Sequence, residues 1–157
     1  MENSKWRGSI EVPVVDSLQR VWEILNDFYG LKKWQPNLLV CERVEGTPTQ
    51  GPGCVRSLSF PSPSSPEKTS WAKEELTSLD CANHCYSYTI IDTNVEGIEG
   101  YEATLQVIEG MEEDKCIVKW SFELNPVDGL SQQEFVGNFS SVLTAAIKSL
   151  QDAISCP

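Results

Sequence analysis

The sequence has little histidine and few basic residues, and both shortages exclude classes of function. It holds 12 Lys plus Arg against 23 Asp plus Glu, a net charge of −11 over 157 residues. Nucleic acids and anionic membranes bind basic surfaces, so neither is an expected partner. The one histidine, His84, stands with Cys81 and Cys85 in a predicted turn, and no second cysteine pair has zinc-site spacing. We therefore expect no metal site.

Long hydrophobic runs are also missing. No stretch reaches the roughly 18 apolar residues that a membrane span requires, and the first six residues lack the apolar core of a secretory signal. A chain of 17.5 kDa is typical of one domain. The sequence thus predicts a single cytoplasmic domain over residues 1–157, with its six cysteines as free thiols because the cytoplasm keeps thiols reduced.

Alternating apolar and polar residues predict a meander of antiparallel strands. Strands are expected at residues 5–12, 39–44, 55–60, 71–79, 86–91, 101–108 and 116–124. Pro13 is expected to end the first strand. Asp16 then begins a helix as its N-cap, with Gln19 three residues on as a capping-box partner. A second short helix is expected over residues 28–34.

The last predicted element is a helix of roughly six turns over residues 131–155. Ser131 and Glu134 have capping-box spacing. Apolar side chains then recur every three or four residues, at Phe135, Phe139, Val142, Leu143, Ala146, Ile147, Leu150 and Ile154. Such a stripe must pack on an apolar surface, and the sheet is the available partner. The fold class is therefore α+β, with one curved sheet gripping a long C-terminal helix.

Three strands each place a polar side chain on an apolar face. Counting by twos puts Arg56, Glu74 and Tyr101 on the inner faces, beside Leu58, Phe60, Ala72, Leu76, Ala103, Leu105 and Val107. Two interpretations stay open. In one, Arg56 and Glu74 form a structural ion pair and Tyr101 is a core aromatic residue. In the other, the three line a cavity for a small molecule, in which Glu74 transfers protons.

Several segments, taken in order, resemble the START/Bet v 1-like superfamily (polyketide cyclase/dehydrase and lipid transport). Within it they are similar to the plant lachrymatory-factor-synthase-like proteins. The segments are VCERVEG (40–46), GCVR (53–56), WAKEEL (71–76), YSY (86–88), GYEATLQVIEG (100–110) and WSF (120–122). The resemblance implies a helix-grip fold with an internal cavity. It also implies a cofactor-independent isomerase or cyclase in which Glu74 transfers a proton while Arg56 and Tyr101 hold the substrate oxygen.

The expected ligand pocket comprises Leu58, Phe60, Ala72, Tyr88, Ala103, Leu105, Trp120, Phe122, Phe135, Phe139, Val142 and Leu143. The alternative to catalysis is a carrier or sensor of small hydrophobic metabolites or lipids that uses the same polar groups as anchors. A protein whose cavity stays empty is a third possibility.

Abscisic-acid receptors are a neighbouring branch of the superfamily, and this chain departs from their pattern. Residues 62–66 (SPSSP) replace the receptor gate, residues 96–98 replace the latch, and Leu39 stands where a ligand-binding lysine is expected. No hormone-gated phosphatase partner is therefore expected. We expect a monomer or weak dimer that binds a small hydrophobic or amphipathic ligand.

Overall fold

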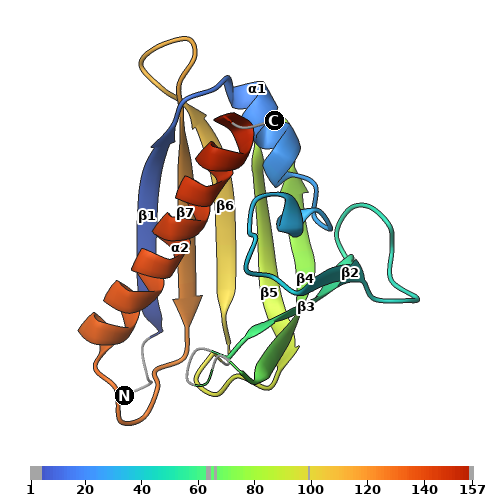
Figure 1. Ribbon diagram of the computed structural model, residues 1–157, viewed down its shortest axis with the longest axis vertical. Coiled ribbons are helices and arrows are strands. Elements are labelled where there is room, and N and C mark those ends of the chain that lie inside the picture. Colours follow the sequence, from blue (N-terminus) through green and yellow to red (C-terminus); the bar gives the residue numbers. More distant parts are fainter. Residues whose placement is uncertain (1–4, 63–64, 66, 99, 156–157) are drawn as a thin grey trace.

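One curved antiparallel sheet and a long helix lying across it make up most of the structure (Figure 1). The computed structural model describes residues 5–62, 65, 67–98 and 100–155. In this part of the chain seven strands form the sheet, in the order β1-β7-β6-β5-β4-β3-β2. They are β1 (Trp6–Val14), β2 (Val40–Arg43), β3 (Val55–Pro61), β4 (Thr69–Asp80), β5 (Cys85–Thr93), β6 (Glu102–Glu109) and β7 (Cys116–Leu124). The α+β helix-grip architecture predicted from periodicity is confirmed.

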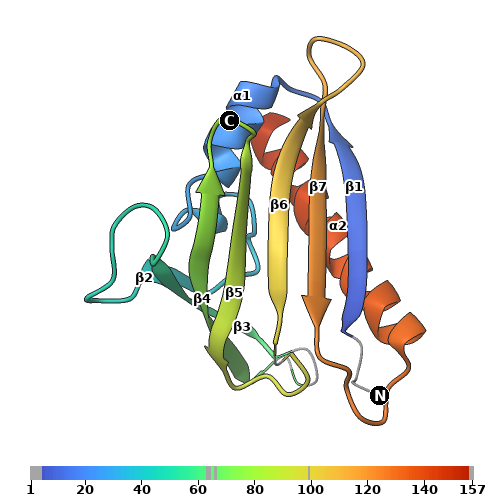
Figure 2. The same cartoon turned by 180° about the vertical axis from the view of Figure 1, so that it is seen from behind.

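The helices all lie on the concave side of this sheet. They are α1 (Leu18–Leu25), the single 3₁₀ turn η1 (Leu31–Lys33) and α2 (Gln132–Ser155). From the other side, Figure 2 shows the outer face of the sheet without helices. None of the helices formed by the described residues is long and apolar enough to cross a membrane.

The long helix α2 follows the sequence pattern with one exception. Its cap is Ser131, whose hydroxyl accepts a hydrogen bond from the backbone N–H of Glu134 at 3.0 Å. Its buried residues are Leu143, Ile147, Leu150 and Ile154. Val142, expected in the buried stripe, is 62% exposed. The stripe is narrower than predicted because α2 packs mainly over β1, so its other flank is not covered by the sheet.

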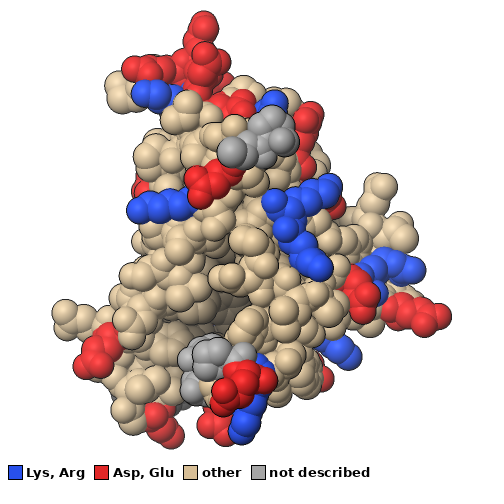
Figure 3. Space-filling view, in the orientation of Figure 1, with Lys and Arg blue, Asp and Glu red and all other residues tan. Residues whose placement is uncertain are grey.

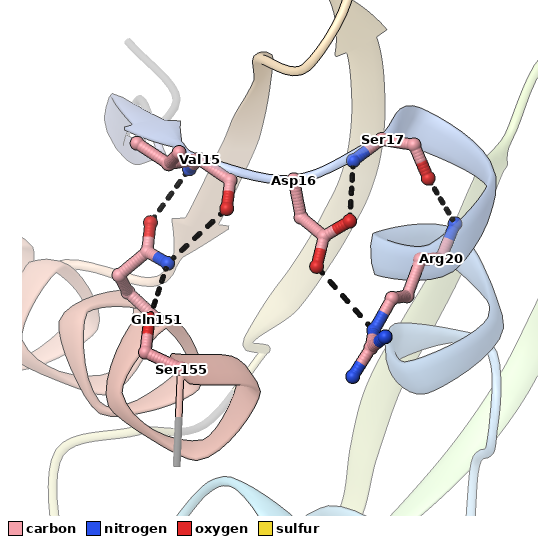
Figure 4. Close-up of polar contacts among 6 residues, drawn as sticks. All are labelled: Val15, Asp16, Ser17, Arg20, Gln151 and Ser155. Atoms are coloured by element: carbon pink, nitrogen blue, oxygen red, sulfur yellow. Dashed lines mark hydrogen bonds and ion pairs between the residues drawn. The ribbon is translucent and has the colours of Figure 1, made fainter. Parts of the chain in front are cut away.

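The N-terminus of α1 corrects a second prediction, because Ser17 and not Asp16 is the N-cap (Figure 4). The Ser17 hydroxyl accepts from the Arg20 backbone N–H at 3.3 Å. Asp16 instead accepts from the Ser17 N–H at 2.6 Å and pairs with the Arg20 side chain. Gln19 donates to Glu23 at 3.2 Å and so points along the helix rather than back to the cap.

Figure 4 also shows how α2 is fastened to the chain between β1 and α1. The side-chain amide of Gln151 accepts from the Val15 backbone N–H at 2.6 Å and donates to the Val15 carbonyl at 3.4 Å. These two bonds fix the C-terminal end of α2 against the end of β1. The helix is thereby held at one side of the sheet, which positions the cavity described below.

Two further expectations need correction. Pro13 does not end β1, which continues to Val14. The strand lies at the edge of the sheet, where a residue without an N–H removes no ladder bond on the open side. The helix expected over residues 28–34 is reduced to η1, because Gly30 and Pro36 leave too few residues for a full α-helical turn to continue.

Candidate functional site

A cavity of about 470 Å³ lies between α2 and the concave face of the sheet. Figure 3 shows the molecular surface hollowed beside α2, with mostly uncharged residues around the hollow. The walls come from η1 and the loop after it, from β3 to β7, and from α2. The lining residues are Leu31, Trp34, Gln35, Pro36, Asn37, Leu38, Arg56, Leu58, Phe60, Ala72, Glu74, Tyr86, Tyr88, Ile90, Ile98, Tyr101, Leu105, Trp120, Phe139, Val142, Leu143, Ala145, Ala146 and Ser149.

Arg56 and Glu74 form a buried ion pair in the wall of the cavity. They are direct cross-strand partners on β3 and β4. The Arg56 Nε and Nη2 atoms lie 2.8 and 2.7 Å from the same carboxylate atom, Oε1 of Glu74. Among the residues that the structure describes, Glu74 Oε2 has no hydrogen-bond partner. The pair therefore satisfies one carboxylate oxygen and leaves the other to the cavity.

The guanidinium of Arg56 is held from two more directions. Its Nη1 donates to the Phe28 carbonyl at 2.9 Å, and its central carbon lies 4.0 Å from the centre of the Phe28 ring. Arg56 is only 2% exposed. Burial by itself would lower the pKa of Arg56, but the Glu74 carboxylate together with Tyr86 and Tyr88 more than offsets this, and the net shift is upward. The arginine is therefore permanently charged and rigidly placed.

Tyr101, one residue before β6, belongs to a second polar group in the cavity. Its hydroxyl lies 3.0 Å from the hydroxyl of Tyr88, which accepts a bond from Trp120 Nε1 at 3.2 Å. Burial raises the pKa of both tyrosines, so both are neutral near pH 7. Three N–H and O–H donors thus share two hydrogen bonds. One hydroxyl proton, on Tyr88 or Tyr101, is left for a ligand.

The structure brings the three predicted polar residues to one cavity, together with nine of the predicted apolar and aromatic residues. Those nine are Leu58, Phe60, Ala72, Tyr88, Leu105, Trp120, Phe139, Val142 and Leu143. Whether Arg56, Glu74 and Tyr101 act on a substrate stays a prediction at this point.

Three residues expected in the pocket do not line the cavity: Ala103, Phe122 and Phe135. Phe122 packs edge-on against Phe139, with ring centres 4.9 Å apart. Phe135 stacks on Phe139 and contacts Trp6 at a tilt of 49°. Ala103 lies beside Phe122 in the β6–β7 register. Phe122 is thus covered by a side chain of α2, and Phe135 is itself one of the α2 side chains that fill the interior. Strand alternation identifies the inner face correctly but does not say where a helix covers it.

Sequence reasoning missed the residues that line the cavity from outside the main strands, above all Trp34. Trp34 is the C-cap of η1, where no periodic pattern marks an inner face. Tyr86 was also missed as a lining residue, although it lies two residues before Tyr88 on the same face of β5. That spacing was the available signal.

The Cys81, His84 and Cys85 turn has a structural role. His84 has a positive φ of 53° and packs edge-on against Trp22, with ring centres 5.6 Å apart. Within the described residues no group of three or more potential ligands comes together as a metal site. Of the segment compared with the receptor gate, residues 63, 64 and 66 lie outside the described residues. Ile98, in the segment compared with the latch, lines the cavity.

The fold and the cavity define the class of protein: a helix-grip protein with a cavity between its sheet and its long helix. Over residues 5–154 the chain matches the family described as polyketide cyclase / dehydrase and lipid transport, and it belongs to that family. The description of the family includes lipid transport, and the walls of the cavity are largely apolar.

Three solved structures are similar to this chain over nearly its whole length. An uncharacterised protein from Bacillus thuringiensis has 25% sequence identity and a TM-score of 0.77, covering 94% of this chain and 97% of that one. The protein XoxI from Bacillus cereus has 26% identity and a TM-score of 0.76, covering 94% of both chains. Ara h 8.0201 has 19% identity and a TM-score of 0.75, covering 97% of this chain and 99% of that one, and it shows the fold alone.

Proposed function

We propose that this protein is a cofactor-independent isomerase or cyclase, similar to lachrymatory-factor synthase, that moves a proton within a small ligand held in the cavity. The observation that supports this most directly is the asymmetry of the Glu74 carboxylate. Arg56 occupies Oε1 with two nitrogens, while Oε2 has no hydrogen bond within the described part of the chain and its residue lines the cavity. A carboxylate oxygen in this position is a suitable general base.

Such a reaction neither gains nor loses protons overall. Glu74 takes a proton from one atom of the ligand at Oε2 and returns it to another atom, so neither an oxidant nor a co-reactant is needed. Arg56 keeps the carboxylate in one orientation, because its own position is fixed by Phe28. A positioned acid–base group of this kind contributes about 10²–10⁴-fold to a rate.

Negative charge that develops on a ligand oxygen needs donors, and the cavity provides them. The unassigned hydroxyl proton of the Tyr88–Tyr101 pair is one such donor. Because both phenols stay neutral well above pH 7, they donate hydrogen bonds rather than repel an anion. Arg56 adds a fixed positive charge in the same wall.

A non-catalytic carrier or sensor is the second candidate, and one observation favours it. Two short contacts from Arg56 hold Glu74 in a buried ion pair, and such a pair can be purely structural. A carrier needs only that the polar groups anchor a ligand. Both proposals place the protein in the cytoplasm, as expected from the sequence.

Glu74→Gln separates the two candidates, because Gln has nearly the same shape but no acid–base function. The matched control is Glu75→Gln, the next residue on β4, which points away from the buried face. The assay starts with an alkenyl sulfenic acid generated in situ from its cysteine sulfoxide and continues with small enolisable compounds. Ligand affinity is measured by calorimetry on the same samples.

For an isomerase, Glu74→Gln lowers turnover by about 10²–10⁴-fold while Glu75→Gln leaves it unchanged. Equal turnover by Glu74→Gln and wild type would remove the catalytic role of Glu74. A wild-type protein that binds these compounds tightly but converts none would establish the carrier instead.

A further inference from the structure

Two buried donors without a hydrogen-bond partner both belong to residues that line the cavity. Across the described residues, the buried side-chain nitrogen and oxygen atoms that lack a partner are Trp34 Nε1 and the Tyr86 hydroxyl. The two residues are 1% and 2% exposed. Native proteins satisfy the large majority of such groups, because an unsatisfied buried donor loses its bonds to water without replacement. A pair of exceptions in the wall of one cavity therefore points to a missing acceptor.

Trp34 marks a part of the cavity separate from the Arg56–Glu74 pair. Its ring packs against Trp120 of β7, with ring centres 6.2 Å apart at an angle of 61°. Glu74 lies on β4, and β5 and β6 separate β4 from β7 in the sheet. The indole N–H of Trp120 donates to the Tyr88 hydroxyl rather than to Trp34. The Trp34 N–H is thus a second polar group of the cavity wall, in a different place from the Arg56–Glu74 pair.

The buried polar groups of the cavity include three donors without an acceptor. Trp34, Tyr86 and the Tyr88–Tyr101 pair each keep one hydrogen without a described acceptor. The tyrosine hydroxyls can also accept hydrogen bonds, whereas the indole N–H of Trp34 can only donate. A pure hydrocarbon would leave every one of these donors unsatisfied, so the donors favour a ligand that carries acceptor oxygens.

We infer that Trp34 is a ligand-binding residue that selects an oxygenated ligand, one with a carbonyl, ether or sulfoxide oxygen to receive its indole N–H in addition to the oxygen held near Arg56 and Tyr101. The inference rests on the proposed function insofar as the cavity must hold a small molecule. The Nε1 atom is almost wholly covered, so binding includes a small movement of the indole ring.

The test compares two probes of the same bicyclic shape. Chromone carries a carbonyl and an ether oxygen and has no donor, whereas naphthalene has neither oxygen. Both are titrated by fluorescence into wild type, Trp34→Phe and the control Trp6→Phe, which removes an indole N–H outside the cavity. In parallel, the five indole N–H signals of ¹⁵N-labelled wild type are followed by NMR, with the Trp34 signal assigned by elimination from variants of the other four tryptophans.

We expect Trp34→Phe to weaken chromone binding by roughly 3- to 10-fold and to leave naphthalene binding within about twofold, since one hydrogen bond is lost. Trp6→Phe changes neither affinity, and chromone moves the Trp34 indole signal downfield. Equal losses for both probes, or a Trp34 signal that chromone does not move, would show that Trp34 is only an apolar wall. The NMR measurement on wild type keeps the test valid if Trp34→Phe does not fold. Failure of both probes to bind wild type would contradict the cavity-ligand proposal itself, and this inference with it.

Discussion

Arg56 and Glu74 face each other across β3 and β4, and two guanidinium nitrogens share a single carboxylate oxygen. This geometry fits both sequence-based interpretations of the pair. It is a structural ion pair that joins two strands, and it also leaves Glu74 Oε2 free of hydrogen bonds from the described residues. Removing one partner of such a buried pair should lower the free energy of unfolding strongly. This effect can be measured without knowing the ligand.

Arg56→Leu should destabilise the protein by about 3–5 kcal/mol, because it leaves the Glu74 carboxylate buried without its charge partner. The double variant Arg56→Leu/Glu74→Leu should regain most of that loss. The control is Arg7→Leu, which removes an exposed partner of Glu123 at 3.6 Å and should cost less than about 1 kcal/mol. Urea unfolding measures all three. A double variant no more stable than Arg56→Leu would show that the charge imbalance is not the cause.

Truncation of two apolar side chains of α2, Ile147 and Val142, should change the free energy of unfolding by very different amounts. Ile147 is fully buried, so Ile147→Ala should lower the free energy of unfolding by about 2–5 kcal/mol. Val142→Ala should change it by less than about 0.5 kcal/mol, since Val142 is exposed at the edge of the cavity. Similar losses at both positions would mean that α2 packs in a different rotation.

Phe139→Ala should lower the free energy of unfolding by about 3–5 kcal/mol. The ring is half-buried but contacts Tyr101, Phe122 and Phe135 at centre distances of 5.4, 4.9 and 6.1 Å. Because Phe139 also lines the cavity, the variant should enlarge it and bind bulkier hydrophobic probes more tightly. A loss near zero in thermal unfolding would contradict the packing of α2 on the aromatic cluster.

Tyr101→Phe should lower turnover by about 10²-fold if its hydroxyl stabilises a substrate oxygen. The cost in stability should be small, about 0.5–1.5 kcal/mol, because only the bond to Tyr88 is lost. Tyr29→Phe is the matched control, since Tyr29 donates to the Pro48 carbonyl outside the cavity. Unchanged kinetics in Tyr101→Phe would remove the hydroxyl from the mechanism.

All four tyrosines should resist ionisation in the folded protein. Burial raises the pKa of Tyr86, Tyr88 and Tyr101, and burial together with Cys54 raises that of Tyr29 to about 12. The unfolded chain ionises near pH 10 and so binds these protons less tightly than the folded state. The contribution to stability is therefore complete below about pH 10 and is lost as the pH rises toward 12 and above.

A spectrophotometric titration at constant ionic strength tests this directly. Tyrosinate absorbance should rise together with loss of the far-ultraviolet circular dichroism signal, and not before it. Reversible ionisation of one tyrosine near pH 10 in a folded sample would contradict the burial of that residue.

The thiols should react in two phases. All six cysteines are expected to be reduced, and the five described ones are free in the structure, whereas Cys156 lies outside the described residues. Cys81 is exposed and should react quickly with a thiol reagent. Cys116 is buried, and burial raises its pKa to about 11, so it should react slowly. Cys81→Ser should abolish part of the fast phase, and fewer than six thiols after denaturation would overturn the reduced assignment.

The sequence alone determined the class of fold and the inner face of each strand. Alternation in Tyr101–Val107 and in Ala72–Leu76 assigns inner and outer positions without ambiguity, because a strand has a period of two and one wrong step would bury charge. The apolar stripe of α2 likewise requires a sheet to cover it. For these reasons the pattern of residues is enough to identify Arg56, Glu74 and Tyr101 as inward-facing.

Tertiary structure decided which part of that inner surface is a cavity and which part is solid core. Phe122 and Trp120 lie on the same face of β7, yet Phe139 of α2 packs against Phe122 while Trp120 stays on the cavity wall. The position of α2 depends on long-range contacts such as the Gln151–Val15 hydrogen bonds, which join residues 136 apart. Trp34 enters the cavity from a short turn without periodicity. Local patterns carry no information about such distant contacts, because the energies that fix them arise only when the chain has folded.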